Sequence, residues 1–179
     1  PEVSISPDPA ATTDDLVAVI DTEPTDEDGD SVSYLYEWTL DGASSTSSTS
    51  DTLPSSTTQR DETWTLTVTP TDGVTTGEAA TAEITISNTE PTVTDVVISP
   101  DPAYADDTLS CSWTFSDDDN DSDSSTVLWT ADGIAAGSET TLTGAFVGGQ
   151  EVICTVTPND GTDTGIDASE SITITNTEP

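Results

Sequence analysis

The chain contains two copies of one sequence pattern. The segment ISPDPA at 5–10 recurs at 98–103, and TVTP with a following Asp-Gly at 67–73 recurs at 155–161. These matches lie 93 and 88 positions apart, so each copy spans about 90 residues with small length differences in its loops. A repeat of this period, close to the size of a small sandwich domain, predicts two domains of one type.

We place the first domain at 1–89 and the second at 90–179. The copies also end alike, because SNTEP at 87–91 is echoed by TNTEP at 175–179. Pro1 stands in phase with Pro91, so another copy could follow without a break. We therefore expect a segment of a longer array, in which further copies of the same repeat are the neighbours.

Polar and apolar residues alternate along much of the chain. In TLSCSWTF at 108–115, every second residue is apolar, which is typical of a strand with one buried face. Thr, Val and Ile are abundant, and no window has the apolar stripe of an amphipathic helix. The apolar content of 31% with high charge is typical of disorder, but this alternation argues against it.

Turn signals divide each copy into about seven short strands, the number found in a Greek-key immunoglobulin-like β-sandwich. We therefore predict an all-β chain with two such sandwiches in tandem. In the second copy the predicted strands lie at 94–99, 107–115, 125–131, 134–136, 139–144, 150–157 and 168–175. In the first copy, four of them are predicted at 14–21, 32–40, 63–69 and 80–87.

The two cysteines, Cys111 and Cys154, fall on the second and sixth predicted strands of the second copy, with Trp129 on a strand between them. In this arrangement an inter-sheet disulfide packs against a buried tryptophan. We expect a disulfide, which requires an oxidising compartment; two small buried thiols are the alternative. The first copy has Ala18 and Leu66 at these places, so hydrocarbon would fill the same space.

The charge of the chain limits its partners and its chemistry. It has 36 acidic residues, one basic residue, Arg60, and no histidine, which gives a net charge of −35. Nucleic acid and anionic membranes are therefore excluded as partners, and cations are favoured. Without histidine, Ser/His/Asp and Cys/His catalysis cannot be assembled, and carboxylates clustered on loops do not suit a glycosidase cleft. We predict no enzyme activity, and no membrane insertion, since no apolar run is long enough.

The segment SPDPAYADDTLSCSWTFSDDDNDSDSSTVLWTADG at 99–133, with its counterpart in the first copy, resembles the immunoglobulin-like and PKD-like repeats of large secreted bacterial surface proteins. The resemblance covers essentially the whole chain and implies an extracellular array at a cell surface. The chain departs from true immunoglobulin domains in two ways. Val152 stands where a tyrosine is expected, and the interval from Cys111 to Trp129 is long because an acidic loop lies inside it.

Two acidic clusters occupy equivalent loops. DEDGD at 26–30 and DDDND at 117–121 each precede the third main strand of their copy. In this fold that loop shares one end of the sandwich with the loop before the last strand, which holds Asp72 in one copy and Asp160 in the other. The incoming linker reaches the same end. The candidate metal ligands are therefore Asp26, Asp28, Asp30, Asp72, Asn88, Glu90, Asp117, Asp119, Asp121 and Asp160.

Such crowding of carboxylates favours a divalent cation. Two carboxylates about 5 Å apart repel by about 0.8 kcal/mol even in water, and no lysine is present to neutralise them. Calcium binds six to eight oxygens, and a loop of alternating aspartates supplies them. The pattern is not that of an EF-hand, and a merely solvated or salt-adapted loop is the alternative. We hypothesise that structural calcium at Asp117, Asp119, Asp121 and Asp160, with Glu90 or Asn88 from the linker, locks successive domains into a stiff rod.

These features together predict a structural, extracellular module of a cell-surface fibre, stalk or adhesin, with lateral fibre partners as a further possibility. The alternative is a carbohydrate- or protein-binding accessory module of a secreted enzyme. A sugar-binding role would need exposed aromatic rings. We expect instead that the four tryptophans belong to the cores, and these are Trp38, Trp64, Trp113 and Trp129.

Overall fold

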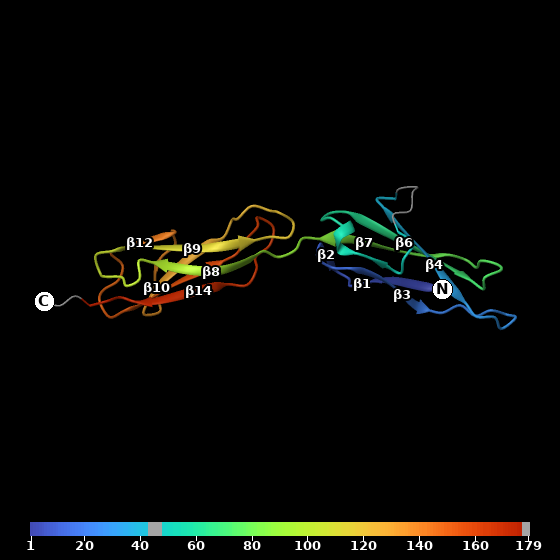
Figure 1. Ribbon diagram of the computed structural model, residues 1–179, viewed down its shortest axis with the longest axis horizontal. Coiled ribbons are helices and arrows are strands. Elements are labelled where there is room, and N and C mark those ends of the chain that lie inside the picture. Colours follow the sequence, from blue (N-terminus) through green and yellow to red (C-terminus); the bar gives the residue numbers. More distant parts are fainter. Residues whose placement is uncertain (43–47, 177–179) are drawn as a thin grey trace. The chain divides into compact units, whose positions relative to one another are not determined.

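The computed structural model describes residues 1–42 and 48–176 (Figure 1). The chain divides into two compact units, residues 1–89 and 90–179. Both are built from strands that pair mainly antiparallel, with one parallel pair between β2 (Ala10–Ala11) and β7 (Ala80–Ser87) in the first unit. The helical structure in the described part is a single 3-10 turn at Ser55–Thr57. No helix among these residues is long and apolar enough to cross a membrane. The last three residues of the repeated TNTEP, 177–179, lie outside the described part.

In the first unit, three strands form one sheet in the order β1-β3-β5, and four form the other in the order β2-β7-β6-β4. The two sheets enclose one apolar core. The strands are β1 (Glu2–Ser6), β2 (Ala10–Ala11), β3 (Leu16–Thr22), β4 (Ser33–Leu40), β5 (Thr52–Leu53), β6 (Thr63–Thr71) and β7 (Ala80–Ser87).

The second unit has the same plan, with sheets in the order β12-β9-β8 and β11-β10-β13-β14 around its own core. The all-β sandwich prediction is confirmed, and the predicted strands match the observed ones to within two residues at each end. The strands are β8 (Thr92–Ser99), β9 (Thr108–Ser116), β10 (Thr126–Ala131), β11 (Ile134–Gly137), β12 (Thr141–Thr143), β13 (Glu151–Thr157) and β14 (Ala168–Thr173).

Alternation along the strands builds the cores. In β6 every second residue is buried, and β13 repeats the pattern. Trp38 and Trp129 are fully buried on equivalent strands, and each indole N–H donates to a backbone carbonyl, that of Ser50 at 2.9 Å and that of Glu139 at 2.8 Å. Trp64 is also buried, so three of the four tryptophans are core residues. Because each buried N–H has an acceptor, these rings add apolar area without an unpaired polar group.

A disulfide joins β9 and β13 across the second unit, between Cys111 and Cys154, whose Cα atoms are 6.4 Å apart. Trp129 lies directly opposite Cys154 in the pairing of β10 with β13. In the first unit, Ala18 and Leu66 occupy the matching register positions, opposite Ile5 and Trp38. The two units thus fill the same place in the core, one with a covalent bridge and the other with hydrocarbon.

Candidate metal centre

The loops after β9 and after β13 meet at one end of the second unit. Ser116, the last residue of β9, pairs with Thr92, the first residue of β8. The backbone N–H of Ser124 donates to the carbonyl oxygen of Asn159 at 2.8 Å and so ties one loop to the other. The acidic loop therefore lies at the end where the chain enters this unit.

The acidic loop is folded around its first aspartate. One carboxylate oxygen of Asp117 accepts a hydrogen bond from the backbone N–H of Asp121 at 2.8 Å, and its carbonyl oxygen accepts one from Asn120 at 3.3 Å. Asn120 lies in the left-handed region at φ 63°, a conformation that asparagine tolerates better than most residues. These bonds bring the first and last aspartates of the cluster to the same side of the loop.

The second loop presents Asp160. Its Oδ1 atom accepts two backbone N–H groups, from Thr162 at 2.6 Å and from Asp163 at 2.7 Å. The Asp160 residue is only 8% exposed, and it is one of two buried polar residues in the described part of the chain. A carboxylate that is this deeply buried needs charged or hydrogen-bonding partners to compensate for the water it has lost.

Three carboxylates converge at this end of the second unit. One ligand atom each of Asp117, Asp121 and Asp160 can be chosen so that all lie within 4.8 Å of one another. At that separation each pair of charges repels by about 0.9 kcal/mol even at the dielectric constant of water, and by more where water is excluded. The Oδ2 atom of Asp117 is also buried and has no hydrogen-bond partner. An orphaned carboxylate oxygen beside two further carboxylates matches the donor set of a hard divalent cation.

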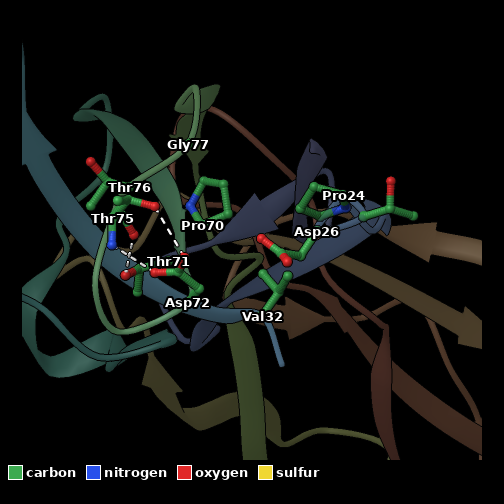
Figure 2. Close-up of a pocket in the computed structure, with 10 residues that line it drawn as sticks. Pro24, Asp26, Val32, Pro70, Thr71, Asp72, Thr75, Thr76 and Gly77 are labelled. Atoms are coloured by element: carbon green, nitrogen blue, oxygen red, sulfur yellow. Dashed lines mark hydrogen bonds between the residues drawn. The ribbon is translucent and has the colours of Figure 1, made fainter. Parts of the chain in front are cut away.

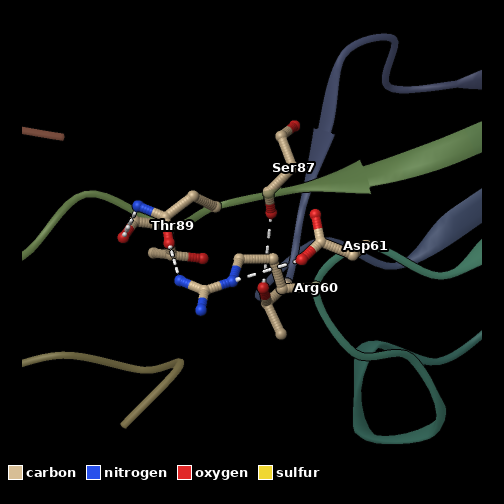
Figure 3. Close-up of polar contacts among 6 residues, drawn as sticks. Arg60, Asp61, Ser87 and Thr89 are labelled. Atoms are coloured by element: carbon tan, nitrogen blue, oxygen red, sulfur yellow. Dashed lines mark hydrogen bonds and ion pairs between the residues drawn. The ribbon is translucent and has the colours of Figure 1, made fainter. Parts of the chain in front are cut away.

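The remaining residues predicted for the second centre lie outside this group. Asp119 is half-buried, and Glu90 is exposed. Asn88 belongs to the first unit, where its side-chain oxygen accepts a hydrogen bond from the Arg60 guanidinium at 2.5 Å. Figure 3 shows this arginine between Asp61 and the chain segment at Ser87 and Thr89. A metal role for these three predicted residues stays a prediction.

The first unit has the same two loops. The Oδ1 atom of Asp26 accepts the backbone N–H groups of Asp28 at 2.9 Å and of Asp30 at 3.1 Å. Gly29 takes the left-handed conformation at φ 81°, at the loop position equivalent to that of Asn120 in the second unit. The sequence repeat is therefore also a repeat of loop conformation.

In the first unit, the carboxylates stay apart. Asp26 and Asp72 both line a cavity of about 140 Å³, together with Pro24, Val32 and Pro70. Figure 2 shows the two carboxylates separated across this pocket, with Asp72 turned into its own loop. Among the described residues, acids converge in this way in the second unit and not in the first. Asp26, Asp28, Asp30 and Asp72 remain predicted ligands.

Hydrogen bonds within its own loop hold Asp72. Oδ1 accepts from the backbone N–H groups of Thr75 at 2.6 Å and Val74 at 2.7 Å, and Oδ2 accepts from the Thr75 hydroxyl at 3.1 Å. The bonds from the Thr75 and Val74 backbone stabilise the charged form and lower the pKa of Asp72. The charge of Asp72 is therefore stabilised within its own loop.

Sequence reasoning missed the bond between Ser124 and Asn159. Neither residue is acidic, and a hydrogen bond between the backbones of two loops cannot be recognised from residue types. Loop length does not reveal it either, since the strand bounds leave about ten residues before β4 and about nine before β10.

The fold has known relatives among solved structures. The chain is similar to a two-domain fibronectin type III segment of chicken tenascin, with a TM-score of 0.50 and 14% identity over 96% of this chain and 97% of that one. It also matches the FN1–FN3 domains of chicken CNTN1 (TM-score 0.39, 9% identity, 90% of this chain and 60% of that one). A third match is to the fibronectin(III)-like modules of Clostridium thermocellum CbhA (TM-score 0.36, 17% identity, 97% and 94%).

No protein-family model and no curated protein sequence matches the chain. The tenascin segment shows the fold, a pair of immunoglobulin-like sandwiches of the fibronectin type III kind. Membership of the PKD-like repeats of bacterial surface proteins stays a prediction.

Proposed function

We propose that the chain is a non-catalytic structural module of an extracellular tandem array, and that its second domain binds structural calcium through Asp117, Asp121 and Asp160. The observation that carries the proposal is the convergence of these three carboxylates within 4.8 Å, one of them with a buried, unpartnered oxygen. The tandem sandwich fold and the disulfide support a structural role outside the cell.

Calcium suits this donor set better than other metal ions do. The described group offers oxygen ligands alone, and the chain has no histidine and no free cysteine, the ligands that transition metals prefer. Magnesium demands a near-ideal octahedron, whereas calcium accepts six to eight oxygens in flexible geometry. Loop carbonyls and water would complete the shell. We expect a dissociation constant in the weak extracellular range, about 10⁻⁴ to 10⁻³ M.

The position of the site supports a role in stiffness. Within the second unit, the acidic loop begins at the residue after Ser116, which pairs with Thr92 close to the point of entry. Residues 90–92 run beside Gly165 and Ile166 of the other loop and line a common cavity with them. Calcium that orders these loops would also order the entering segment. We propose that this restricts the linker and stiffens the array in a fibre, stalk or adhesin.

A direct test is isothermal titration calorimetry with calcium on the full chain and on matched Asp→Asn variants. Asp160→Asn should lose the binding heat of this site, because it removes the most buried ligand charge. Asp118→Asn is the control, since it removes one charge from the same loop at an exposed residue outside the group. If the two variants bind calcium equally well, the proposed site is wrong.

A carbohydrate-binding accessory role has less support. Trp38, Trp64 and Trp129 are buried, so their faces are not available to stack on a sugar ring. Trp113 is half-buried, and its indole N–H donates to Asp123 at 3.0 Å. The structural role is therefore the function that we propose.

A further inference from the structure

The apolar core of the second unit ends in a layer of three polar residues. Along β9, β10 and β13, every second residue faces the core. Followed past the strand ends with the same two-residue period, this face reaches Asp117 after β9, Ser125 before β10 and Asp160 after β13. Asp117 and Asp160 belong to the proposed calcium site, whereas the site described so far gives Ser125 no role.

Ser125 lies beside the loop that carries Asp160. The hydrogen bond from the Ser124 N–H to the Asn159 carbonyl oxygen continues the register of β10 with β13 beyond the strand ends. Ser125 is therefore opposite Pro158, two positions before Asp160. Diagonal neighbours of this kind on one face of a sheet have β-carbons about 7 Å apart. That spacing leaves room for one cation between the two side chains.

Two side-chain oxygens of this layer are buried without a hydrogen bond. The Oγ atom of Ser125 and the Oδ2 atom of Asp117 have no partner among the residues that the structure describes, so they do not bond to each other either. Buried polar atoms are nearly always paired, because an unpaired one has lost its water without compensation. One divalent cation would receive lone pairs from both oxygens at once, and calcium binds neutral oxygens as well as carboxylates.

We propose that the Ser125 hydroxyl is a fourth side-chain ligand of calcium in the second domain, beside the carboxylates of Asp117, Asp121 and Asp160. This inference rests on the proposed function, because it requires calcium at that site. The three carboxylates already repel one another at their separation of at most 4.8 Å. A hydroxyl adds one more oxygen to the coordination shell and adds no further negative charge to the group.

The first domain has a tyrosine at the equivalent position. Tyr34 pairs with Pro70, the last residue of the first TVTP segment, as Ser125 lies opposite Pro158 in the second. The Tyr34 side chain packs against the core and lines a cavity together with Asp26. A ring in the place of a small hydroxyl side chain fills space between the two loops, which agrees with the wider separation of the carboxylates in this domain. The first domain should therefore bind calcium more weakly than the second.

Amide NMR spectra of the full chain, recorded during a titration with calcium chloride, test the proposal. The N–H groups of Thr162 and Asp163 donate to Asp160, so their shifts report on occupation of the site. Ser125→Ala removes the hydroxyl and little volume. Ser124→Ala is the matched control, because this neighbouring serine is exposed and contacts the other loop through its backbone. We expect the dissociation constant to rise about tenfold or more in Ser125→Ala and to stay unchanged in Ser124→Ala.

Thermal unfolding in chelator separates a lost ligand from a damaged fold. Without calcium, Ser125→Ala should melt at the wild-type temperature or above it, because the substitution removes a buried oxygen that has no partner. The wild-type titration also compares the two domains. The N–H groups of Val74 and Thr75, which bond to the equivalent aspartate of the first domain, should need at least about tenfold more calcium to shift.

The possible failures are distinguishable. If the wild-type chain binds calcium at Thr162 and Asp163 and Ser125→Ala binds it equally well, the hydroxyl is not a ligand, although the calcium site itself stands. Equal affinities of the two domains would overturn the role given to Tyr34. If the wild-type signals of Thr162 and Asp163 do not respond to calcium at all, the proposed function is wrong and this inference falls with it.

Discussion

The carbonyl oxygen of Pro91 occupies the space that a side chain at Gly165 would need, since a β-carbon built there would overlap it. Gly165 lies in the loop after β13, and its N–H donates to the Pro158 carbonyl at 3.1 Å. The glycine therefore lets the entering chain pack directly against the loop that carries Asp160. This contact places the start of the second domain beside the candidate metal centre.

Gly165→Ala should destabilise the second domain by about 1 to 3 kcal/mol, the usual cost of overpacking. Denaturant unfolding of the full chain would measure it. Gly77→Ala at the equivalent position of the first domain is the control, because there the closest contact is the flexible ring of Pro70 at 3.0 Å. Equal losses for the two variants would mean that the Pro91 contact has no special role.

Reduction of the disulfide should affect one domain alone. The bridge between Cys111 and Cys154 spans a sequence separation of 43 residues, and closing a loop of that size contributes about 4 kcal/mol in the chain-entropy model. Calorimetry with a reducing agent should lower the unfolding temperature of the second domain. The first domain, with Ala18 and Leu66 in these places, should unfold as before. A shift of both transitions would contradict this account.

Arg60 should hold the segment that leaves the first domain. Its guanidinium donates to Asn88, and Arg60→Met would remove that bond while it keeps most of the aliphatic stem. We expect a loss of about 1 kcal/mol and faster amide exchange at 87–89. Asp61→Asn is the control, because the 3.9 Å ion pair involves a carboxylate that is 90% exposed and contributes little. Unchanged exchange in Arg60→Met would refute the anchoring role.

The pKa of Asp72 should lie below its ordinary value of 3.8, because the N–H groups of Thr75 and Val74 stabilise the carboxylate. Because the pKa is lower in the folded state than in the unfolded state, its contribution to stability is fully present at pH values above the unfolded-state pKa. That stabilisation is lost as the pH falls through the folded pKa. Carboxyl carbon chemical shifts over a pH titration would measure it, with Asp72→Asn to assign the signal. An inflection at or above 3.8 would show that these bonds do not hold in solution.

The sequence predicted the strands well because alternation is a local signal. Leu109, Cys111, Trp113 and Phe115 in β9 alternate as expected, and the repeat placed matching strands in both copies. Trp113 is the weak point of the core prediction, since it is half-buried rather than buried. Its position near the end of β9 brings it within reach of Asp123, which accepts its N–H.

The candidate site was harder to predict, because charge spacing does not determine which oxygens meet. Asp117 and Asp121 come together because the backbone N–H of Asp121 donates to the Asp117 carboxylate and closes their loop, while Asp119, in the same run of acids, is not part of the converging group. In the first domain, nearly the same bonds form, yet the cavity between the loops separates Asp26 from Asp72. Such differences depend on packing between loops, which periodicity does not report.

The central claim, that calcium binds at Asp117, Asp121 and Asp160, is tested most directly by thermal unfolding of the full chain with 10 mM calcium or with chelator. For a dissociation constant of about 10⁻⁴ to 10⁻³ M, calcium should stabilise the second domain by about 1.4 to 2.7 kcal/mol. The unfolding temperature of this domain should rise in the wild type and in Asp118→Asn, and it should not rise in Asp160→Asn. Identical melting of the wild-type second domain in calcium and in chelator would contradict the claim.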